Sequence, residues 1–543
     1  MKKNILILGA GFLQKPAVTA AKKLGYNTVV VDADPNAVCI PLADQFVRID
    51  LKDKDGIYVL AQKLSAGGGL ASVFTAGTDF SASVSFSGEK LGLPCHTYEA
   101  ALNASSKARM RACFTESGVP SPSFFRVTKN EVEKGVIHAL VTKLGFPCVV
   151  KPADNMGARG CRMIRCDEEV EEAAFAAVAN SRTGTAVVEQ YMDGPEYSID
   201  ALVYGGTMTI TGFADRHIYY PPYFIETGHT MPTEIDAVKR SELIAVFALG
   251  VKALGLTCGA AKADIKYTEK GPMIGEIAAR LSGGYMSGWT YPYASECNLT
   301  EQALLIACGQ TPAYLEKHRV PVAYEPPASC RGQQAPFELY EVISTKTSAE
   351  RAWISIPGVV NDVIGIDHAA SVTGIKNVFP RSHPGSHVHF PRNNVEKCGN
   401  VIALAGNRGD AVTAAEKAVS RIVVRLEPNC VETEEFLSES AGKSENGFPP
   451  PAYIVLCDMN KISGTIPHGV PVSDVVPHEL QTLFLSDDAE DWNHRTLRVT
   501  CALFDVVCPD HPDLDAQTFW KAVIRGGIQG ALYVSDTAQG ERT

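Results

Sequence analysis

Short apolar runs alternate with amphipathic segments over the first hundred residues. The runs are rich in Val, Ile and Leu, and they lie at Ile5–Leu8, Thr28–Val31, Phe46–Ile49 and Ala71–Thr75. A helix is predicted between the first two runs, over Ala17–Leu24. Continuous apolar runs separated by helical patterns are typical of parallel strands covered on both faces. The sequence therefore predicts a doubly wound α/β domain over residues 1–104.

From about residue 105 the pattern changes to a mixture of single helices and strands. The predicted segments are a helix over Lys107–Glu116, a strand over Phe124–Val127, a helix over Glu131–Leu144, a helix capped by Asp167, and strands from Thr185 to Tyr220. These strands carry alternating β-branched and aromatic residues, as pleated sheets do. We expect an α+β domain over residues 105–310.

The C-terminal part reads as two further folded regions. A mixed segment over residues 311–430 ends in a patterned helix, Asp410–Val424. Residues 432–451 are rich in Ser, Gly, Glu and Pro, which predicts a linker. Residues 452–543 carry strand-like runs and are expected to form a small extra domain whose role the sequence does not indicate.

Composition narrows the possible partners. The chain has 543 residues, a length that predicts three or four domains. Its hydrophobic fraction of 45% and charged fraction of 20% are ordinary for globular proteins and sufficient for a large core. A net charge of −11 without clustered Lys and Arg argues against a nucleic-acid partner. No apolar run approaches the roughly 20 residues that span a bilayer, so no membrane partner is expected. A homodimer stays an open alternative.

Cysteine usage and the N-terminus both favour a cytoplasmic protein. The 15 cysteines include no CxxC pair, which is typical of buried thiols in a reducing compartment. The N-terminal apolar run leads into Gln14, Lys15 and Pro16 without a cleavage pattern, so we interpret it as a first strand. Gly9 and Gly11 follow that strand, but Gln14 occupies the third glycine position of a dinucleotide motif. A plain small-residue turn is the favoured interpretation.

A lysine and a glycine-rich loop suggest a phosphate site. Lys151 ends the apolar strand CVVKP, where an ammonium group is costly unless it meets an anion. Gly157 and Gly160 follow, and glycines let backbone N–H groups close around phosphate oxygens. Arg159 adds positive charge. The alternative is a tight hairpin whose lysine reaches solvent.

The next segment suggests sites for a nucleoside. A buried strand ends at Glu189, and the chain leaving it near Tyr191 and Met192 offers backbone groups to an adenine edge. Glu196 lies seven residues after Glu189 and could accept from ribose hydroxyls. An ordinary strand–turn–strand with solvated acids is the alternative.

Two acids and an arginine suggest a metal and a transferred phosphoryl group. Asp264 and Glu276 each lie in an apolar strand, and the strands are joined by a turn at Glu269–Pro272. Inward carboxylates on paired strands repel unless a cation lies between them. Arg280 could stabilise charge on a phosphoryl group. A structural salt bridge between Arg280 and either acid is the alternative.

In their order and spacing these segments resemble the ATP-grasp superfamily, from the N-terminal lobe to about Glu427. The resemblance implies a pre-ATP-grasp domain over residues 1–104, an ATP-grasp domain over 105–310 with a lid over about 121–190, and a C-terminal lobe over 311–430. It implies ATP as co-substrate, Mg²⁺ or Mn²⁺ at Asp264 and Glu276, and Arg280 as the catalytic arginine. The residues implied to bind ATP are Lys107, Lys151, Gly157, Arg159, Gly160, Glu189, Gln190, Tyr191, Met192 and Glu196.

This chain departs from the family pattern at one position. Many members carry an asparagine two residues after the second acid, as a further metal contact, and this chain has Ala278 there. The departure predicts a second metal that is held less tightly, or through a water or substrate oxygen.

The substrate pocket is predicted from an aromatic-rich segment over residues 215–235, which has no helix or strand period. Ordering such a segment costs conformational entropy, which contacts with a ligand or with the rest of the protein must offset. In this hypothesis Arg216 or His217 holds a substrate carboxylate, and Glu226 and His229 meet an incoming amine. Residues Ser282, Gly283 and Gly284 form the floor of the same pocket. A surface loop packed on the sheet is the alternative.

The predicted function is an ADP-forming ligase that activates a small carboxylate as an acyl phosphate and joins it to an amine, with amino-acid-type substrates. A bicarbonate- or purine-pathway-type ATP-grasp ligase is one alternative. A non-catalytic nucleotide sensor is another. Substrate-dependent release of ADP and phosphate distinguishes a catalyst from a sensor.

Overall fold

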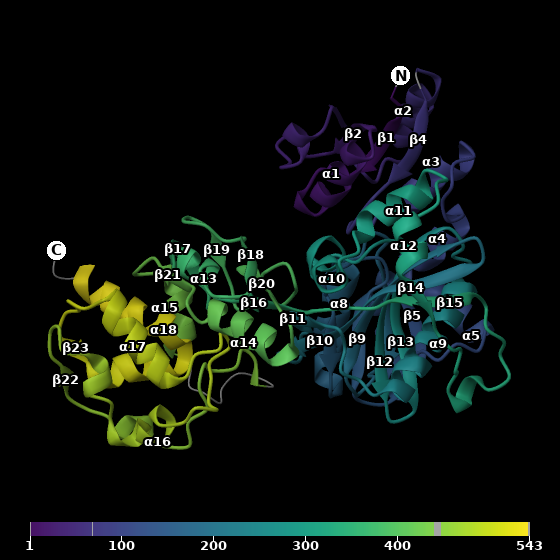
Figure 1. Ribbon diagram of the computed structural model, residues 1–543. Helices are drawn as coiled ribbons and strands as arrows, with labels where there is room; N and C mark the ends of the chain where they lie inside the picture. The colour runs from purple at the N-terminus through teal and green to yellow at the C-terminus, as the bar shows by residue number, and fades with distance from the viewer. Residues whose placement is uncertain (1, 68, 439–446, 541–543) are drawn as a thin grey trace. The chain divides into compact units, whose positions relative to one another are not determined.

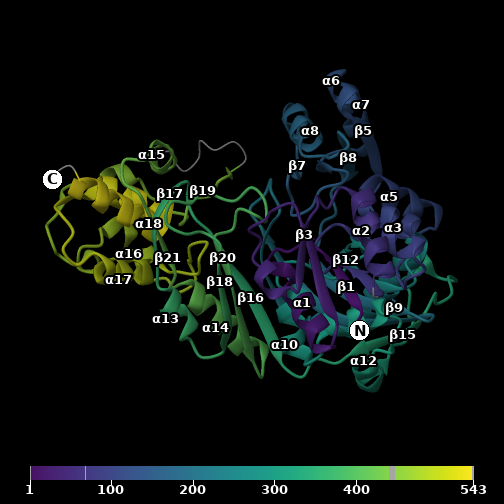
Figure 2. The ribbon, with the colours of Figure 1, turned by 90° about the horizontal axis from the view of Figure 1, so that it is seen from above.

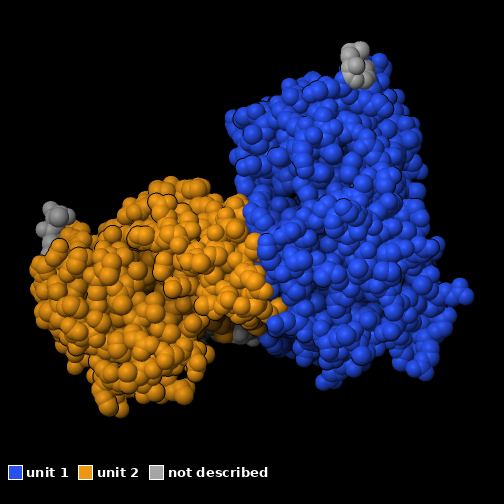
Figure 3. Space-filling view, in the orientation of Figure 1, with its two compact units in different colours: residues 1–217, 229–348 blue, residues 218–228, 349–543 orange. Residues whose placement is uncertain are grey.

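The computed structural model describes residues 2–67, 69–438 and 447–540, which form two units (Figure 3). Unit 1 comprises residues 1–217 and 229–348, and unit 2 comprises residues 218–228 and 349–543. None of the helices in the described ranges combines the length and apolar character needed to cross a bilayer.

Unit 1 begins with a parallel sheet in the order β3-β2-β1-β4, of which Figure 1 labels β2, β1 and β4. Its strands are β1 (Asn4–Leu8), β2 (Asn27–Asp32), β3 (Gln45–Arg48) and β4 (Leu70–Phe74), and its helices include α1 (Lys15–Lys23), α2 (Lys54–Ala66) and α3 (Ser81–Lys90). Ile5 and Ile7 pack in one cluster with α1, whereas Leu6 and Leu8 pack in another with α2. Both faces are therefore covered, as the uninterrupted apolar runs predicted.

Gln14 has a structural role at the turn after β1. Its side chain is buried, its Oε1 accepts from the Ala76 N–H at 2.9 Å, and its Nε2 donates to Thr78 Oγ1 at 2.9 Å. The side chain also fills the space beside Gly9, where an added Cβ would lie 3.3 Å from Gln14 Cγ. Gln14 thus joins the ends of β1 and β4.

A second sheet, in the order β5-β8-β6-β7, forms a small layer with three helices (Figure 2). The strands are β5 (Phe124–Thr128), β6 (Cys148–Pro152), β7 (Arg162–Ile164) and β8 (Thr185–Gln190), and the helices are α6 (Lys129–Glu133), α7 (Val136–Leu144) and α8 (Val170–Ala179). The single helix predicted over Glu131–Leu144 is wrong, because Gly135 adopts a φ of 68° and separates α6 from α7. The cap at Asp167 is also wrong: Asp167 contacts His138, and Glu169 precedes α8.

The largest sheet segment of unit 1 has the order β13-β12-β9-β10 and is antiparallel throughout. Its strands are β9 (Glu196–Tyr204), β10 (Thr207–Tyr219), β12 (Gly259–Thr268) and β13 (Gly271–Ala278), extended by β15 (Glu338–Val342) and β14 (Arg319–Pro321). One face packs on α5 (Lys107–Glu116) and α9 (Ala237–Leu254) through a core that includes Phe114, Phe247 and Ile274. On the opposite face, Leu202 and Ala214 pack in another cluster with Tyr291, and polar side chains occupy other positions of β12. The remaining helices of the unit are α4 (Tyr98–Ser105), α10 (Tyr291–Ser295), α11 (Leu299–Ala307) and α12 (Ala313–His318).

The segment over residues 215–235 is not irregular, which corrects the sequence-based expectation. Most of it lies in β10 and β11 (Ile225–Met231), with the pair Pro221 and Pro222 between them. Six of the seven residues of β11 are buried, polar Glu226 and His229 among them, so no alternation marks it as a strand. The chain passes between units at residues 217/218 and 228/229 of this segment.

Unit 2 contains several groups of paired strands together with helices. Its strands are β16 (Thr347–Trp353), β17 (Gly358–Ile364), β18 (Ile375–Pro380), β19 (His387–Val388), β20 (Gly399–Ala405) and β21 (Val423–Leu426), in the orders β16-β20-β18 and β19-β17-β21. Helix α13 (Ile366–Ala370) and α14 (Arg408–Val419) cover them. The helix predicted to reach Val424 ends earlier, because the β-branched pair Val423 and Val424 forms β21.

Residues beyond 430 belong to the same unit. Helix α15 (Val431–Ser438) occupies the start of the predicted linker, and residues 439–446 of that linker lie outside the described residues. The C-terminal part contains α16 (Gln481–Phe484), α17 (Leu497–Val507), α18 (Ala516–Gly540), β22 (Thr465–Ile466) and β23 (Leu514–Asp515). Helix α18 contacts both β21 and α15.

Candidate active site

Two acids face each other across the β12–β13 hairpin of unit 1. The strand register places Asp264 opposite Glu276 and Lys262 opposite Ala278. Residues 262, 264 and 266 are half-buried and alternate with the buried residues 261, 263 and 265, so all three polar side chains share one face. That face therefore carries Lys262, Asp264 and Lys266 side by side.

Lysines and an arginine hold Glu276 ionised. Burial alone would raise the pKa of the Glu276 carboxyl, but Lys107, Lys262, Lys151 and Arg280 outweigh it and lower this pKa to about 2. Lys107 Nζ lies 3.5 Å from Glu276 Oε1. The carboxylate is thus available as an anionic oxygen ligand at neutral pH.

Arg216 links Glu196 of β9 to Asp264 of β12. Its Nη1 contacts Glu196 Oε1, and it lies 2.6 Å from Asp264 Oδ1. Lys262 Nζ contacts Asp264 Oδ2. Arg216 is predicted to hold a substrate carboxylate, and in the structure it lies between Glu196, the predicted ribose ligand, and Asp264, the predicted metal ligand. His217, its neighbour, contacts Thr230 Oγ1 through Nε2 at 2.9 Å.

The predicted adenine segment is partly engaged in internal hydrogen bonds. The Tyr191 N–H donates to the Pro147 carbonyl at 3.2 Å, so it is not exposed as the sequence suggested. The Met192 carbonyl accepts from Lys266 Nζ at 3.1 Å, and Lys266 also lies 3.7 Å from Glu196 Oε2. Gln190 donates its N–H to the Ser123 carbonyl at 3.0 Å. Lys266 therefore connects the predicted adenine segment to Glu196.

Glu189 is the centre of a buried ion-pair cluster. Lys151 Nζ contacts Glu189 Oε1, and Arg111 Nη2 lies 3.1 Å from Glu189 Oε2. Burial alone would raise the pKa of Glu189, but Arg111 and Lys151 outweigh it and the pKa is lowered. Arg111 also donates to the Gly275 carbonyl at 2.7 Å, on β13. The cluster joins α5, β6, β8 and β13.

Replacing Arg111 by methionine is expected to destabilise the protein strongly. The substitution keeps most of the side-chain volume but leaves Glu189, 2% exposed, with Lys151 as its cationic neighbour. Removing one partner of a buried ion pair costs about 3–5 kcal/mol. Urea unfolding should show this loss, whereas Arg109→Met, which removes an exposed pair with Glu99, should cost less than about 1 kcal/mol. Equal effects of the two substitutions would contradict the assignment.

Lys107 connects the acids to the glycine-rich loop. It is the first residue of α5, it is buried, and its Nζ donates to the Asn155 carbonyl at 2.9 Å. Burial acts to lower the pKa of Lys107, but Glu276 and Asp79 outweigh it, so the pKa is raised. Gly157 and Gly160 follow with φ of 69° and 65°, the left-handed region that glycine adopts without strain. Arg159 lies between these two glycines.

Arg280 and the segment Ser282–Gly284 lie against the N-terminal domain. Arg280 Nε is 3.7 Å from Asp79 Oδ1, and an added Cβ at Gly77 would lie 2.9 Å from Gly283 Cα. Ser282 donates its N–H and Oγ to Asp200 Oδ2 at 3.0 and 2.8 Å. Burial raises the pKa of Asp200 to about 6, although Ser282 acts to lower it.

The remaining two predicted residues lie on β11. His229 is fully buried in unit 1. Glu226 belongs to unit 2, where Lys397 Nζ donates to its carbonyl at 2.7 Å and Asn394 Oδ1 accepts from its N–H at 2.8 Å. Their prediction as amine-side residues stays a prediction.

Several charged residues around this site were missed from the sequence: Asp79, Arg111, Asp200, Lys262 and Lys266. Two signals could have found most of them. Arg111 lies four residues after Lys107, hence on the same face of α5. Lys262 and Lys266 lie two residues on either side of Asp264, hence on the same face of β12. Asp79 and Asp200 reach the site only through tertiary contacts.

Three segments of the chain match known family models. Residues 144–288 match the ATP-grasp domain, residues 1–67 match the ribonucleotide synthetase preATP-grasp domain, and residues 352–427 match the L-amino acid ligase C-terminal domain 2. These matches confirm the predicted resemblance to the ATP-grasp superfamily. The predicted fold class and the predicted enzyme class, an ATP-grasp ligase, are thereby confirmed.

The chain is also similar to curated proteins and, in fold, to solved structures. The chain is 24% identical to the uncharacterized protein y4rH of Sinorhizobium fredii, over 79% of this chain and 84% of that one. It is 25% identical to carnosine synthase 1 of Homo sapiens over 57% of this chain, a match that spans only 40% of the human protein. The L-amino acid ligase from Bacillus licheniformis shares the fold with a TM-score of 0.64 at 17% identity, covering 78% of this chain and 99% of that one.

Proposed function

We propose that this ATP-grasp ligase joins an amino-acid-type carboxylate to an amine, with an acyl phosphate as the intermediate. The observation that carries the proposal is the register of β12 and β13, which sets Asp264 opposite Glu276. The cations that act on Glu276 are Lys107, Lys262, Lys151 and Arg280. A site of this kind positions a triphosphate and neutralises charge as a phosphoryl group moves. The matches to an L-amino acid ligase domain and to carnosine synthase support an amino-acid-type substrate.

In this proposal each predicted residue keeps a defined role. Lys107, Lys151 and the loop from Gly157 to Gly160 hold the phosphates, and Arg280 stabilises the transferred phosphoryl group. The segment Glu189–Met192 lies along the adenine, and Glu196 accepts from the ribose hydroxyls. Substrate-side roles are proposed for Arg216, His217, Glu226, His229 and Ser282–Gly284. A cytoplasmic location is part of the same proposal.

Magnesium fits the residues of the hairpin. Mg²⁺ prefers hard oxygen ligands and is commonly held by one or two carboxylates together with substrate phosphates. Asp264 and Glu276 supply such oxygens from facing positions, and the pKa of Glu276 near 2 keeps it anionic. A bound Mg²⁺ would neutralise the charge on the transferred phosphoryl group.

Lys262 offers an explanation for the presence of Ala278 where many family members carry a metal-binding asparagine. Ala278 carries no ligand atom, and the residue opposite it across the hairpin is Lys262, whose ammonium contacts Asp264. Lys262 also acts to lower the pKa of Glu276. We propose that this ammonium supplies the positive charge that a second metal ion supplies elsewhere, so that the site takes one divalent cation.

A substrate panel tests the proposed function. Purified protein with Mg²⁺ and ATP is incubated with each of the twenty amino acids, alone and in pairs, and with bicarbonate and small carboxylates. Release of ADP and phosphate that requires one carboxylate and one amine, together with an amide product detected by mass spectrometry, is the expected result. Phosphate release with bicarbonate alone, or ATP binding without turnover on any pair, would contradict it.

A further inference from the structure

Unit 2 carries a cluster of metal-ligating side chains that the proposed active site does not use. His387 and His389 on and after β19 lie beside Glu432 of α15, and one ligand atom from each falls within 4.8 Å of the others. His387 Nδ1 is 3.8 Å from Glu432 Oε2, and the two imidazole rings are 5.1 Å apart. All three side chains are exposed.

The alternation of exposed and buried residues places the two histidines on the same side of the chain, at β19 and just after it. Val388 and Phe390 are 5% and 3% exposed and pack into the core of unit 2, while His387 and His389 alternate with them and face solvent. Side chains two residues apart on a strand point the same way. The spacing His-x-His therefore presents two imidazoles from a fixed surface.

The strand and the helix are both anchored to the start of β17. Val359 pairs with His387 and Gly358 with Val388. Thr433, next to Glu432, donates its Oγ1 to the Pro357 carbonyl at 2.8 Å. The approach is close: a Cβ at Gly358 would lie 2.6 Å from Thr433 Oγ1. The three ligand side chains thus stand on elements whose separation is already fixed.

We propose that His387, His389 and Glu432 bind a borderline divalent transition metal, with Zn²⁺ as the representative ion and water in the fourth position. Two imidazoles and one carboxylate form a donor set that zinc takes in proteins, at bonds of about 2.0–2.2 Å. Neighbouring ligand atoms of such a site lie roughly 3.3–3.5 Å apart, so side-chain rotation alone closes the cluster. Hard Mg²⁺ disfavours imidazole, which separates this site from the hairpin acids. Bound metal would join α15 to β19.

Zinc binding by the full-length protein tests this site independently of the ligase activity. Equilibrium titration with Zn²⁺ against a chromophoric chelator, in excess Mg²⁺, should show one site per chain. His389→Ala and Glu432→Gln should each weaken it by at least about tenfold, and His387→Ala with His389→Ala should abolish it. Co²⁺ in place of Zn²⁺ should give visible absorption bands that the double variant lacks. Circular dichroism without metal should show that these surface variants fold normally.

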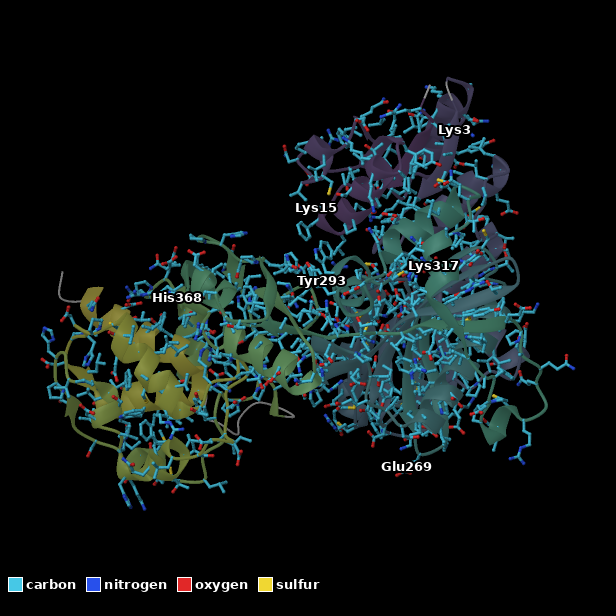
Figure 4. The ribbon with its side chains drawn as sticks, viewed as in Figure 1. Lys3, Lys15, Glu269, Tyr293, Lys317 and His368 are labelled. Atoms are coloured by element: carbon cyan, nitrogen blue, oxygen red, sulfur yellow. The ribbon has the colours of Figure 1, made fainter. Side chains whose placement is uncertain are left out.

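Two control variants make the result decisive. His368→Ala removes another exposed histidine of unit 2, labelled in Figure 4, and should leave zinc affinity unchanged. Glu276→Gln removes a carboxylate of the hairpin and should also leave it unchanged. The proposal is overturned if the wild-type protein binds no zinc, if the double variant binds as tightly as wild type, or if either control loses the site.

Discussion

Glu276→Gln is expected to lower the rate of substrate-dependent ADP release by about 10³-fold or more, because the amide no longer supplies an anionic metal ligand. The four cations that lower the pKa of Glu276 would then lack their carboxylate partner. Affinity for a non-hydrolysable ATP analogue should change little, since Lys107 and Lys151, which are proposed to hold the phosphates, remain. Single-turnover kinetics and calorimetric binding measure the two effects separately.

The same hairpin offers a matched control for this substitution. Glu269 lies at the turn between β12 and β13 and is labelled in Figure 4. Glu269→Gln makes the identical chemical change away from the facing acids, and turnover should stay within about twofold of wild type. Retained turnover in Glu276→Gln would remove this residue from the metal site.

Lys262→Gln is expected to lower kcat/KM by about 10²-fold, because a fixed charge beside Asp264 and Glu276 is lost from the transition state. With a saturating ATP analogue, wild type should bind one Mn²⁺ per chain by electron paramagnetic resonance. Ala278→Asn alone should still bind one, since Lys262 keeps its contact with Asp264. The double variant Lys262→Gln with Ala278→Asn should bind two.

Lys270→Gln is the matched control for the lysine substitution. Lys270 is exposed at the turn of the hairpin, so both kcat/KM and the number of Mn²⁺ ions should match wild type. Two Mn²⁺ ions in the wild-type protein would show that Lys262 does not replace a metal. In that case Lys262 would be a structural partner of Asp264 only.

The sequence predicted those parts of the fold where periodicity and burial coincide. The four N-terminal strands fall close to the predicted ranges because each follows a short apolar run, and α5 does so because Gly118 and Pro120 follow its end. The strand β11 escaped prediction for the opposite reason: Glu226, His229 and Thr230 are polar residues that are nonetheless buried. Polar residues without alternation predict a loop, so the hydrophobic pattern could not identify this strand.

The candidate site likewise contains residues that could be predicted from the sequence and residues that could not. Asp264, Glu276 and Arg280 could be named from spacing, since strand register follows from a short turn. The partners of these residues could not, because Arg216 on β10 meets Asp264 on β12 across the intervening strand β9, and Arg111 meets Glu189 across 78 residues of chain. Such pairings depend on tertiary packing. Sequence spacing carries little information about them.

The central claim is that one face of the β12–β13 hairpin binds the divalent cation and the triphosphate together. A crystal structure of the protein with Mn²⁺ and a non-hydrolysable ATP analogue tests it most directly, because anomalous scattering locates manganese independently of the protein density. The account predicts one manganese peak within bonding distance of Asp264 and Glu276, about 2.2 Å from a carboxylate oxygen of each, with the γ-phosphate beside it. Manganese and nucleotide bound elsewhere, with these two carboxylates still paired to Lys262 and Lys107, would contradict the account.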